Sequence, residues 1–350
     1  MKISSSFGEY SVSIVSNFDE LQKSLASYEF RGAIVDSQVL QKYWNKSDFL
    51  STVPTLEVTA SENAKSYQGL GAVFEWMANN RFDRKSKLLA IGGGTIQDIA
   101  TFAAATFHRG IEWTYVPTTL LSQADSCIGG KCGINLSSLK NQVGLVYPPT
   151  SIYADTSFLL GLGATDLISG MGEILKICVT GEGQFWSEYK DLVDGRRIHD
   201  LDFEKLTSLA LLAKKYVIEE DEMELNFRRV LNYGHTIGHA IEAASSFQIP
   251  HGIGVIMGIK AISILGITWG LTPIDLGNEI IARADDLLSQ YEKSVDFDAT
   301  KAIEMLNHDK KASAGSILFV VLRAVGQHEF VSRPYNSQLM LEVREALDNL

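Results

Sequence analysis

Three of the seven histidines of this 350-residue chain stand close together, at positions 235, 239 and 251. His235 and His239 are four residues apart, so their rings share one face if the segment is helical. His251 follows Pro250, beyond the expected end of that helix. Convergent imidazoles are typical ligands of a divalent metal ion. The pattern therefore predicts a metal site built from these histidines.

An upstream carboxylate is a candidate for a further ligand of this site. Glu173, in the run from Gly170 to Lys176, is the best placed of the upstream acids. The alternative is that buried histidines only satisfy helix hydrogen bonds. That alternative is weaker for three neighbouring histidines than for one, because burying several titratable rings without a function is costly.

A glycine-rich turn predicts a second site, one for phosphate groups. The apolar run 88–91 leads into Gly92-Gly93-Gly94, and a helix-like run rich in alanine follows. Glycines let a pyrophosphate approach the backbone, and a helix N-terminus offers free N–H groups and a positive dipole. Asp98 and Asp36, the latter at the end of another strand-like run, are candidates to bind a ribose. A tight turn without a ligand is the alternative, because the spacing is not GxGxxG.

Cationic and amide side chains around a glycine pair predict an anion pocket. Asp125 precedes Gly129-Gly130, and Lys131, Lys140 and Asn141 follow it. Such groups hold phosphate or carboxylate by charge-assisted hydrogen bonds. Isolated lysines are usually solvated, but small turn-forming residues surround these and favour a site that faces inward.

Further cations follow downstream. Lys214 and Arg228 flank the acidic run 219–222, and Arg228 stands one helical turn before Asn232. Their charges suit a carboxylate or a phosphate, whereas the acidic run is typical of a solvated helix end. The run 308–311, His-Asp-Lys-Lys, adds Lys311 as another cationic candidate.

The order of strand-like and helix-like runs predicts an α/β protein. Residues 10–15, 32–36, 87–91 and 112–116 read as strands, and residues 63–80 have helical periodicity, as in a parallel α/β sheet. Helical stretches such as 206–220 and 274–291 then dominate, until a strand-like run at 316–321. We therefore predict an N-terminal parallel-sheet nucleotide-binding domain (1–155) and a mainly α-helical metal- and substrate-binding domain (156–350).

Composition narrows the functional class. The net charge of −11 argues against nucleic acid as the main partner, although a local basic cluster can still hold a small anion. We expect no membrane span, because no apolar run approaches the necessary length, and the N-terminus has no signal-peptide pattern. Three cysteines without a CxxC pair predict reduced thiols. These features predict a soluble cytoplasmic protein.

Together these motifs resemble the 3-dehydroquinate synthase family of sugar-phosphate cyclases, relatives of the iron-dependent alcohol and glycerol dehydrogenases. The match runs from about residue 60 to residue 330 and implies a homodimeric, NAD-dependent enzyme with zinc or cobalt. It is carried by Gly92-Gly93-Gly94 with Asp98, Phe107 to Gly110, Pro117 to Leu121, Asp125 through Lys131, Lys140-Asn141, Glu173 with Lys176, and Asn232 through His239 with His251-Gly252.

The resemblance also implies a role for each site residue. It gives Glu173, His235 and His251 as the metal ligands, whereas spacing alone would pair His235 with His239. The substrate phosphate would be bound by Lys131, Asn141, His239 and Lys311 of one subunit. Arg109 of the partner subunit would complete this phosphate site. Other substrate contacts would come from Asp125, Lys176, Lys214, Arg228 and Asn232. The NAD contacts would come from Glu62, Lys65, Gly92, Gly93, Gly94, Asp98, Thr118, Thr119, Lys131, Lys140 and the stretch from Phe158 to Gly161.

The implied reaction converts 3-deoxy-D-arabino-heptulosonate 7-phosphate into 3-dehydroquinate and phosphate, by oxidation, β-elimination, reduction and aldol cyclisation. The chain departs from the usual family pattern at Ile253, at Leu139 and in lacking a proline after residues 158–162. Arg228 and Asn232, which cyclases of sugars without a carboxylate tend to lose, are both present. Alternatives are aminodehydroquinate synthase or another specialised cyclase, and a metal- and NAD-dependent polyol dehydrogenase. A dehydrogenase, however, has no use for so many phosphate-binding cations.

Overall fold

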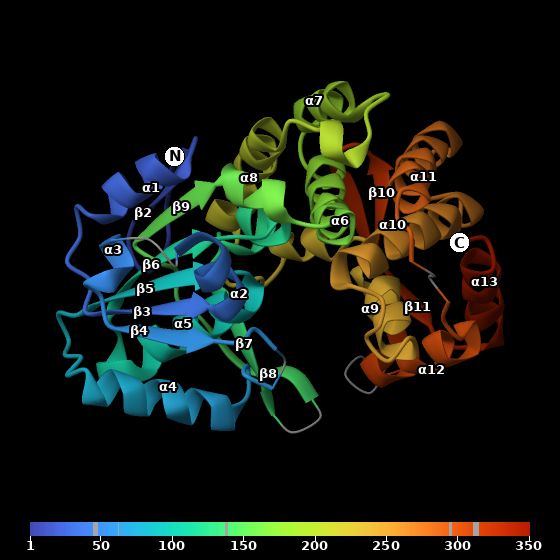
Figure 1. Ribbon diagram of the computed structural model, residues 1–350. Coiled ribbons are helices and arrows are strands. Elements are labelled where there is room, and N and C mark those ends of the chain that lie inside the picture. Colours follow the sequence, from blue (N-terminus) through green and yellow to red (C-terminus); the bar gives the residue numbers. More distant parts are fainter. Residues whose placement is uncertain (45–47, 62, 137–138, 294–295, 311–314) are drawn as a thin grey trace. The chain divides into compact units, whose positions relative to one another are not determined.

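The computed structural model describes residues 1–44, 48–61, 63–136, 139–293, 296–310 and 315–350 (Figure 1). Contacts within the chain divide it into two compact units, Met1–Leu162 and Gly163–Leu350. The expected boundary at 155 precedes the 3-10 helix η4 (Thr156–Gly161), which belongs to the first unit.

The first unit is built on a seven-stranded sheet with the strand order β1-β2-β9-β6-β5-β3-β4. β1 is antiparallel to β2, and every other neighbouring pair is parallel, which confirms the expected parallel α/β sheet. The strands are β1 (Lys2–Ile3), β2 (Tyr10–Val15), β3 (Gly32–Asp36), β4 (Thr55–Val58), β5 (Lys87–Gly92), β6 (Glu112–Pro117) and β9 (Ser151–Asp155).

Apolar runs explain the central strands. Every residue of β3, and every residue of β5 after Lys87, is buried, as expected for strands covered on both faces. The helices are α1 (Phe18–Leu25), α2 (Ser37–Val39), α3 (Asp48–Ser51), α4 (Tyr67–Asn79) and α5 (Gly94–Thr106), with the π-helices η1 (Leu40–Trp44) and η3 (Ser122–Ser126) and the 3-10 helix η2 (Phe107–Arg109). Helix α4 begins later than the predicted residue 63, because Ser66 caps it by accepting the Gly69 N–H.

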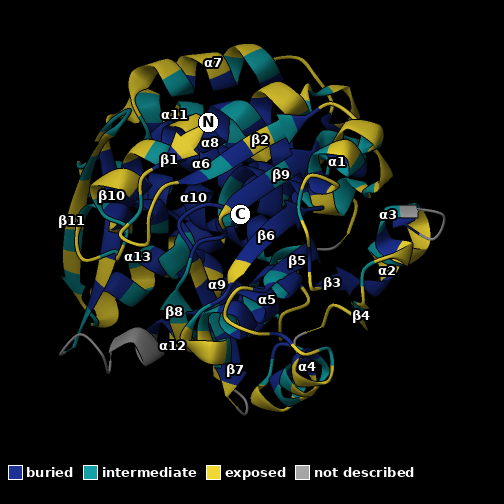
Figure 2. Ribbon diagram, turned by 90° about the vertical axis from the view of Figure 1, so that its left-hand side faces the viewer, coloured by how far each residue is buried: buried dark blue, intermediate teal, exposed yellow. Residues whose placement is uncertain are grey.

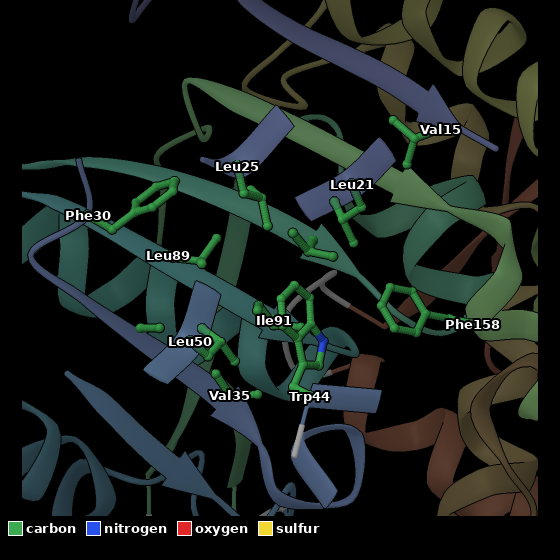
Figure 3. Close-up of a cluster of buried hydrophobic side chains, with 12 residues drawn as sticks. Val15, Leu21, Leu25, Phe30, Val35, Trp44, Leu50, Leu89, Ile91 and Phe158 are labelled. Atoms are coloured by element: carbon green, nitrogen blue, oxygen red, sulfur yellow. The ribbon is translucent and has the colours of Figure 1, made fainter. Parts of the chain in front are cut away.

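A cluster of buried side chains joins helix, sheet and η4 in this unit (Figure 3). Leu21 and Leu25 come from α1, and Leu89 and Ile91 come from β5. Phe158 of η4 belongs to the same cluster, so the apolar interior extends to the end of this unit.

Residues 131–136 and 139–146 form a β-hairpin that the sequence analysis did not predict. β7 (Lys131–Leu136) pairs antiparallel with β8 (Leu139–Val146), and Lys131 lies opposite Val146. Cys132 and Ile134 are buried while Lys131 and Leu136 are exposed, which is the alternation of a half-buried strand. The small polar residues of this stretch had suggested turns instead.

The second unit is mainly helical, as predicted. Its helices are α6 (Ala164–Thr180), α7 (Gly183–Val193), α8 (Phe203–Glu220), α9 (His235–Ala244), α10 (His251–Thr268), α11 (Ile274–Ser289), α12 (Ala299–Lys310) and α13 (Ser337–Leu347), with the 3-10 helices η5 (Ile198–Asp200) and η6 (Phe227–Asn232). Its only sheet among the described residues is the antiparallel pair of β10 (Ser316–Ala324) and β11 (Gln327–Pro334).

Helix α10 is the buried centre of this unit, and it is drawn dark blue along much of its length in Figure 2. By length and composition it could cross a membrane, which corrects the expectation that no segment approaches that limit. However, 78% of it is buried inside the protein, as in the core helix of a globular domain.

Glycines bring α9 and α10 unusually close. A Cβ on Gly258 would lie 2.0 Å from the backbone oxygen of Gly234, and one on Gly238 would lie 2.7 Å from that of Gly254. Close packing of the two helices sets the separation between the histidines that each helix carries.

Candidate active site

The three histidines converge because two helices begin with them. His235 is the first residue of α9, after Gly234 in the left-handed region at φ +79°. His239 follows one turn later, and His251 is the first residue of α10, after Pro250. The fourth member, Glu173, lies in the middle of α6 and is 1% exposed.

Glu173 faces a ring nitrogen of two of these histidines. Its Oε1 lies 3.0 Å from Nε2 of His251 and 3.6 Å from Nε2 of His235. The ring centroids of the three histidines are 5.1 to 5.5 Å apart. The structure therefore brings together all four residues that the sequence analysis had proposed as possible metal ligands.

Two sets of ligands are compatible with this cluster. One donor atom from each of His235, His239 and His251 lies within 4.8 Å of the others, which agrees with the histidine spacing. Glu173 with His235 and His251 is the set that the family resemblance implies. Glu173 is 1% exposed, and its buried charge needs a positive partner. This donor set of one carboxylate and two imidazoles suits a divalent cation such as zinc.

The charges of the cluster are strongly coupled. Burial by itself would raise the pKa of Glu173, but the charges of Lys176 and His235 hold it well below its usual range. For His251, hydrogen bonds to Glu173 and Glu242 outweigh burial and raise its pKa to about 10. Burial and the neighbouring His235 and His251 lower the pKa of His239. The unliganded protein thus holds a negative carboxylate against a protonated His251.

The second ring nitrogens of both proposed histidine ligands are also held. Nδ1 of His235 lies 3.3 Å from the Tyr233 carbonyl oxygen, and Nδ1 of His251 lies 2.9 Å from Oε1 of Glu242. Both rings therefore turn Nε2 towards Glu173. The sequence analysis missed Glu242, although its position seven residues after His235 places it on the same face of α9.

Two predicted lysines are buried in the same unit. Lys176, one helical turn after Glu173 on α6, donates its ammonium to the Glu173 carboxylate. Lys214 is buried on α8, a helix that packs against α6. Both had been expected to contact the substrate, and both lie in the unit that holds the histidines.

Helix η6 supplies the next two predicted residues. Arg228 is 4% exposed, and its guanidinium donates to the backbone oxygen of Glu222. Asn232 donates its amide to Oε1 of Glu224 at 3.0 Å. Asp221, within the acidic run, accepts the backbone N–H groups of residues 225, 226 and 228. This carboxylate therefore orders the segment before η6. The sequence analysis expected the acidic run to be a solvated helix end and did not predict this role.

A pocket of about 250 Å³ opens beside the histidines. Asn232, His235 and His239 line it together with residues of β10 and β11, among them Leu318 and Phe330. A small polar molecule in this pocket would contact the histidine cluster and the end of η6.

In the first unit, the glycine-rich turn lies between β5 and the N-terminus of α5, as predicted. Gly93 is the N-cap of α5, and no side chain caps its free N–H groups. The Thr118 N–H donates to the Gly92 carbonyl oxygen, and a Cβ on Gly93 would lie 3.1 Å from Cγ2 of Thr119. Parallel strands β5 and β6 thus bring Gly92, Gly93, Gly94, Thr118 and Thr119 to one edge of the sheet.

Asp98 and Lys65 form an ion pair of 2.6 Å next to this turn. Asp98 also accepts the backbone N–H of Gly133, so the pair ties the β7–β8 hairpin to α5. On the hairpin, Asn141 has a left-handed φ of +52°, and its N–H donates to the side chain of Asn135. The β7–β8 hairpin, which Asp98 anchors, therefore carries the three predicted anion-binding residues, Lys131, Lys140 and Asn141.

Other predicted residues have evident structural contacts. Asp36 caps α2 by accepting the Gln38 N–H, and Phe158 packs in the apolar cluster with its centroid 4.9 Å from that of Tyr43. Gly161 is exposed and accepts a hydrogen bond from Lys42.

Of the four remaining predicted residues, the structure describes two. Asp125 lies in η3, and Arg109 is exposed at the end of η2 with φ +68°. Glu62 and Lys311 lie outside the described residues.

Sequence comparison assigns the family. Residues 55–169 match the 3-dehydroquinate synthase N-terminal domain, and residues 170–312 match the 3-dehydroquinate synthase C-terminal domain. The chain belongs to the 3-dehydroquinate synthase family. The expected family and enzyme class are thereby confirmed.

Similar proteins support the assignment over most of the chain. A 3-dehydroquinate synthase of Dehalococcoides mccartyi is 34% identical over 276 residues, which cover 78% of this chain and 76% of that protein. One of Clostridium tetani is 30% identical and covers 97% of this chain and 93% of its own length.

Solved structures share the fold at lower identity. A 2-deoxy-scyllo-inosose synthase, complexed with carbaglucose-6-phosphate, NAD+ and Co2+, has a TM-score of 0.84 at 23% identity and covers 99% of both chains. A 2-epi-5-epi-valiolone synthase from Streptomyces hygroscopicus, with NAD+ and Zn2+ bound, has a TM-score of 0.82 at 23% identity and covers 97% of this chain and 96% of its own. These likenesses confirm the predicted fold class.

Proposed function

We propose that this protein converts 3-deoxy-D-arabino-heptulosonate 7-phosphate into 3-dehydroquinate and phosphate, with NAD and a divalent cation, zinc or cobalt, as cofactors. The observation that carries the proposal is the pocket that Asn232, His235 and His239 line together with Arg229; the neighbouring Arg228 is buried on the same helix, η6. A guanidinium in this setting suits a substrate that bears a carboxylate as well as a phosphate.

Glu173, His235 and His251 would hold the cation, and residues 92–94 with Thr118 and Thr119 would hold NAD. When bound, the cation polarises a substrate hydroxyl, and the nicotinamide accepts a hydride and later returns it. The donor set fits, because one buried carboxylate faces two imidazole Nε2 atoms. NAD phosphates would meet the uncapped N–H groups of α5.

The remaining predicted residues would bind and orient the substrate. Lys176, which pairs with Glu173, and Lys214, which is buried on α8, would hold or move protons at the substrate hydroxyls. Lys131, Asn141, His239 and Lys311 would bind the phosphate. Arg109 of the partner subunit would bind it as well. This last contact requires a homodimer, and the exposed position of Arg109 supports it. We propose the cytoplasm as the compartment, with neither nucleic acid nor a membrane as a partner.

Product analysis tests the reaction class. The protein is incubated with NAD, zinc and the seven-carbon acid phosphate, and free phosphate and NADH absorbance are followed together. We expect phosphate release without net NADH, because the hydride is returned within each turnover. Net NADH would contradict the proposal and identify a dehydrogenase. Absence of both signals from metal-loaded protein would also contradict it.

Replacement of Arg228 tests the substrate assignment. We expect Arg228→Ala to raise KM for the acid phosphate about 10- to 100-fold, the scale of a lost hydrogen bond to a charged group, about 1.5–3 kcal/mol. KM for sedoheptulose 7-phosphate, which lacks the carboxylate, should change little. Arg228→Lys, which keeps the charge, is the matched control and should lie between the wild type and Arg228→Ala. Higher kcat/KM of the wild type for sedoheptulose 7-phosphate would instead identify a specialised cyclase.

A further inference from the structure

We propose that Glu242 is a positioning residue of the metal site. Its carboxylate holds the Nδ1–H group of His251, so that Nε2 is the ring nitrogen left to bind the cation. The inference rests on the metal site of the proposed function, because it assigns a role to a residue that supports one of the three ligands.

Two carboxylates fix the His251 ring from opposite sides. Oε1 of Glu242 lies 2.9 Å from Nδ1, and Oε1 of Glu173 lies 3.0 Å from Nε2. His251 is the first residue of α10, so the helix holds its backbone while these two contacts set the rotation of the imidazole ring. A cation that is bound by Glu173 would take the place of the Nε2 proton and leave the Glu242 contact intact.

Glu242 is held in place through its backbone. It is 12% exposed at the C-terminal end of α9, where the Glu242 backbone oxygen accepts the N–H of Phe247 and the hydroxyl of Ser245. Gly254 of α10 leaves room for it, because a Cβ there would lie 2.8 Å from Cγ of Glu242. The carboxylate therefore reaches His251 across a contact between two helices that only glycine permits.

The hydrogen bond decides which tautomer binds metal. A neutral imidazole has one N–H, and a charged acceptor at Nδ1 keeps the proton there and leaves the lone pair on Nε2. Carboxylate partners of metal-bound histidines also make the ring a stronger donor. In the corresponding place, Nδ1 of His235 faces the neutral carbonyl oxygen of Tyr233 at 3.3 Å. Glu242 is thus the stronger of the two anchors.

Metal affinity tests this role directly. Zinc dissociation constants are measured by competition with a chelating dye for the wild-type protein, Glu242→Ala and Glu242→Gln. We expect a 10- to 100-fold weaker affinity for Glu242→Ala, the usual effect of losing such a partner. Glu242→Gln keeps an acceptor oxygen without the charge and should lose less. Glu279→Gln is the matched control, because Glu279 also bonds side chains of its unit, Trp186 and Lys190, but lies outside the cluster.

A second readout separates positioning from general damage. Proton NMR of the zinc-loaded wild type should show a slowly exchanging imidazole N–H signal that disappears in Glu242→Ala and remains in Glu279→Gln. Unchanged zinc affinity and an unchanged signal in Glu242→Ala would overturn the inference while leaving the metal site intact. Failure of the wild type to bind zinc or cobalt stoichiometrically would overturn the metal site and this inference with it.

Discussion

Glu173 is the residue on which the proposed chemistry depends most. It is 1% exposed, it pairs with Lys176, and its Oε1 faces the Nε2 atoms of His235 and His251. A buried carboxylate is stable only when cations or hydrogen bonds compensate its charge. The unliganded site meets that need with a lysine and a protonated histidine, and a bound cation would replace the histidine proton.

Single-residue variants distinguish the two possible ligand sets. We expect His235→Ala to lose zinc on dialysis, because His235 is a ligand in both sets. His239→Ala should retain one zinc per chain and lose turnover, because His239 would contact the substrate and not the metal. Elemental analysis measures the metal, and His199→Ala, on helix η5 and outside the histidine cluster, is the control. Loss of zinc from His239→Ala would instead establish the three-histidine set.

At the scale of elements, the contact between α9 and α10 sets the distances within the metal site. Both helices start at a histidine, and glycines along their contact bring the backbones together. The segment before η6 has a comparable role, because the Asp221 carboxylate collects three backbone N–H groups. Neither feature touches a substrate, yet each fixes residues that would.

Separation of α9 from α10 should weaken metal binding. Gly258→Ala places a Cβ 2.0 Å from the Gly234 carbonyl oxygen, so the helices must move apart. We expect a loss of about 1–3 kcal/mol in the free energy of unfolding, typical of overpacking, together with weaker zinc affinity. Gly71→Ala in α4, where a Cβ meets nothing within 4 Å, should stabilise the protein slightly. Equal stability and zinc affinity of the two variants, measured by denaturant melts and dye competition, would contradict this prediction.

Release of the segment before η6 should impair substrate binding. Burial opposes ionisation of Asp221, but the backbone N–H groups of Asn226 and Arg228 lower its pKa below 3.8. Its contribution to stability is therefore present above pH 3.8 and is lost as the pH falls through the lowered pKa. At neutral pH, Asp221→Ala should reduce kcat/KM about tenfold, equivalent to about 1.4 kcal/mol, mainly through KM. An unchanged KM in steady-state assays would show that Asp221 does not position Arg228.

At the scale of the whole molecule, each unit has its own interior. The first buries a parallel sheet, and the second buries helix α10. The three cysteines, Cys127 and Cys132 in the first unit and Cys178 in the second, are all free and buried. This agrees with the prediction of reduced thiols.

The thiols should report on the integrity of both units. Burial and the charge of Asp98 raise the pKa of Cys132 to about 12, and burial likewise raises the pKa of Cys178. Because the thiolate is the reactive form, we expect all three to react slowly with a disulfide reagent at pH 8. Unfolded protein should titrate three thiols per chain at once. Rapid reaction of Cys132 in the native protein would show that the hairpin opens readily.

The sequence by itself predicted the elements with strong periodicity and proposed the residues that the structure brings together around Glu173. The apolar strands at 32–36 and 87–91 and the helix at 274–291 were recognisable, because burial on one or both faces leaves a local pattern. The histidines and Glu173 could be proposed from residue type, spacing and resemblance. Such signals can be recognised within one segment, without knowing which element packs against it.

The tertiary structure alone decided which of these residues meet. Glu173 and His251 are far apart in sequence, and their 3.0 Å contact exists only because α6 and α10 pack together. The β7–β8 hairpin, the Asp98–Lys65 pair and the Glu242–His251 bond were likewise hidden. The physical reason is that hydrogen bonds between elements depend on helix packing and strand pairing, which residue spacing along one segment does not encode.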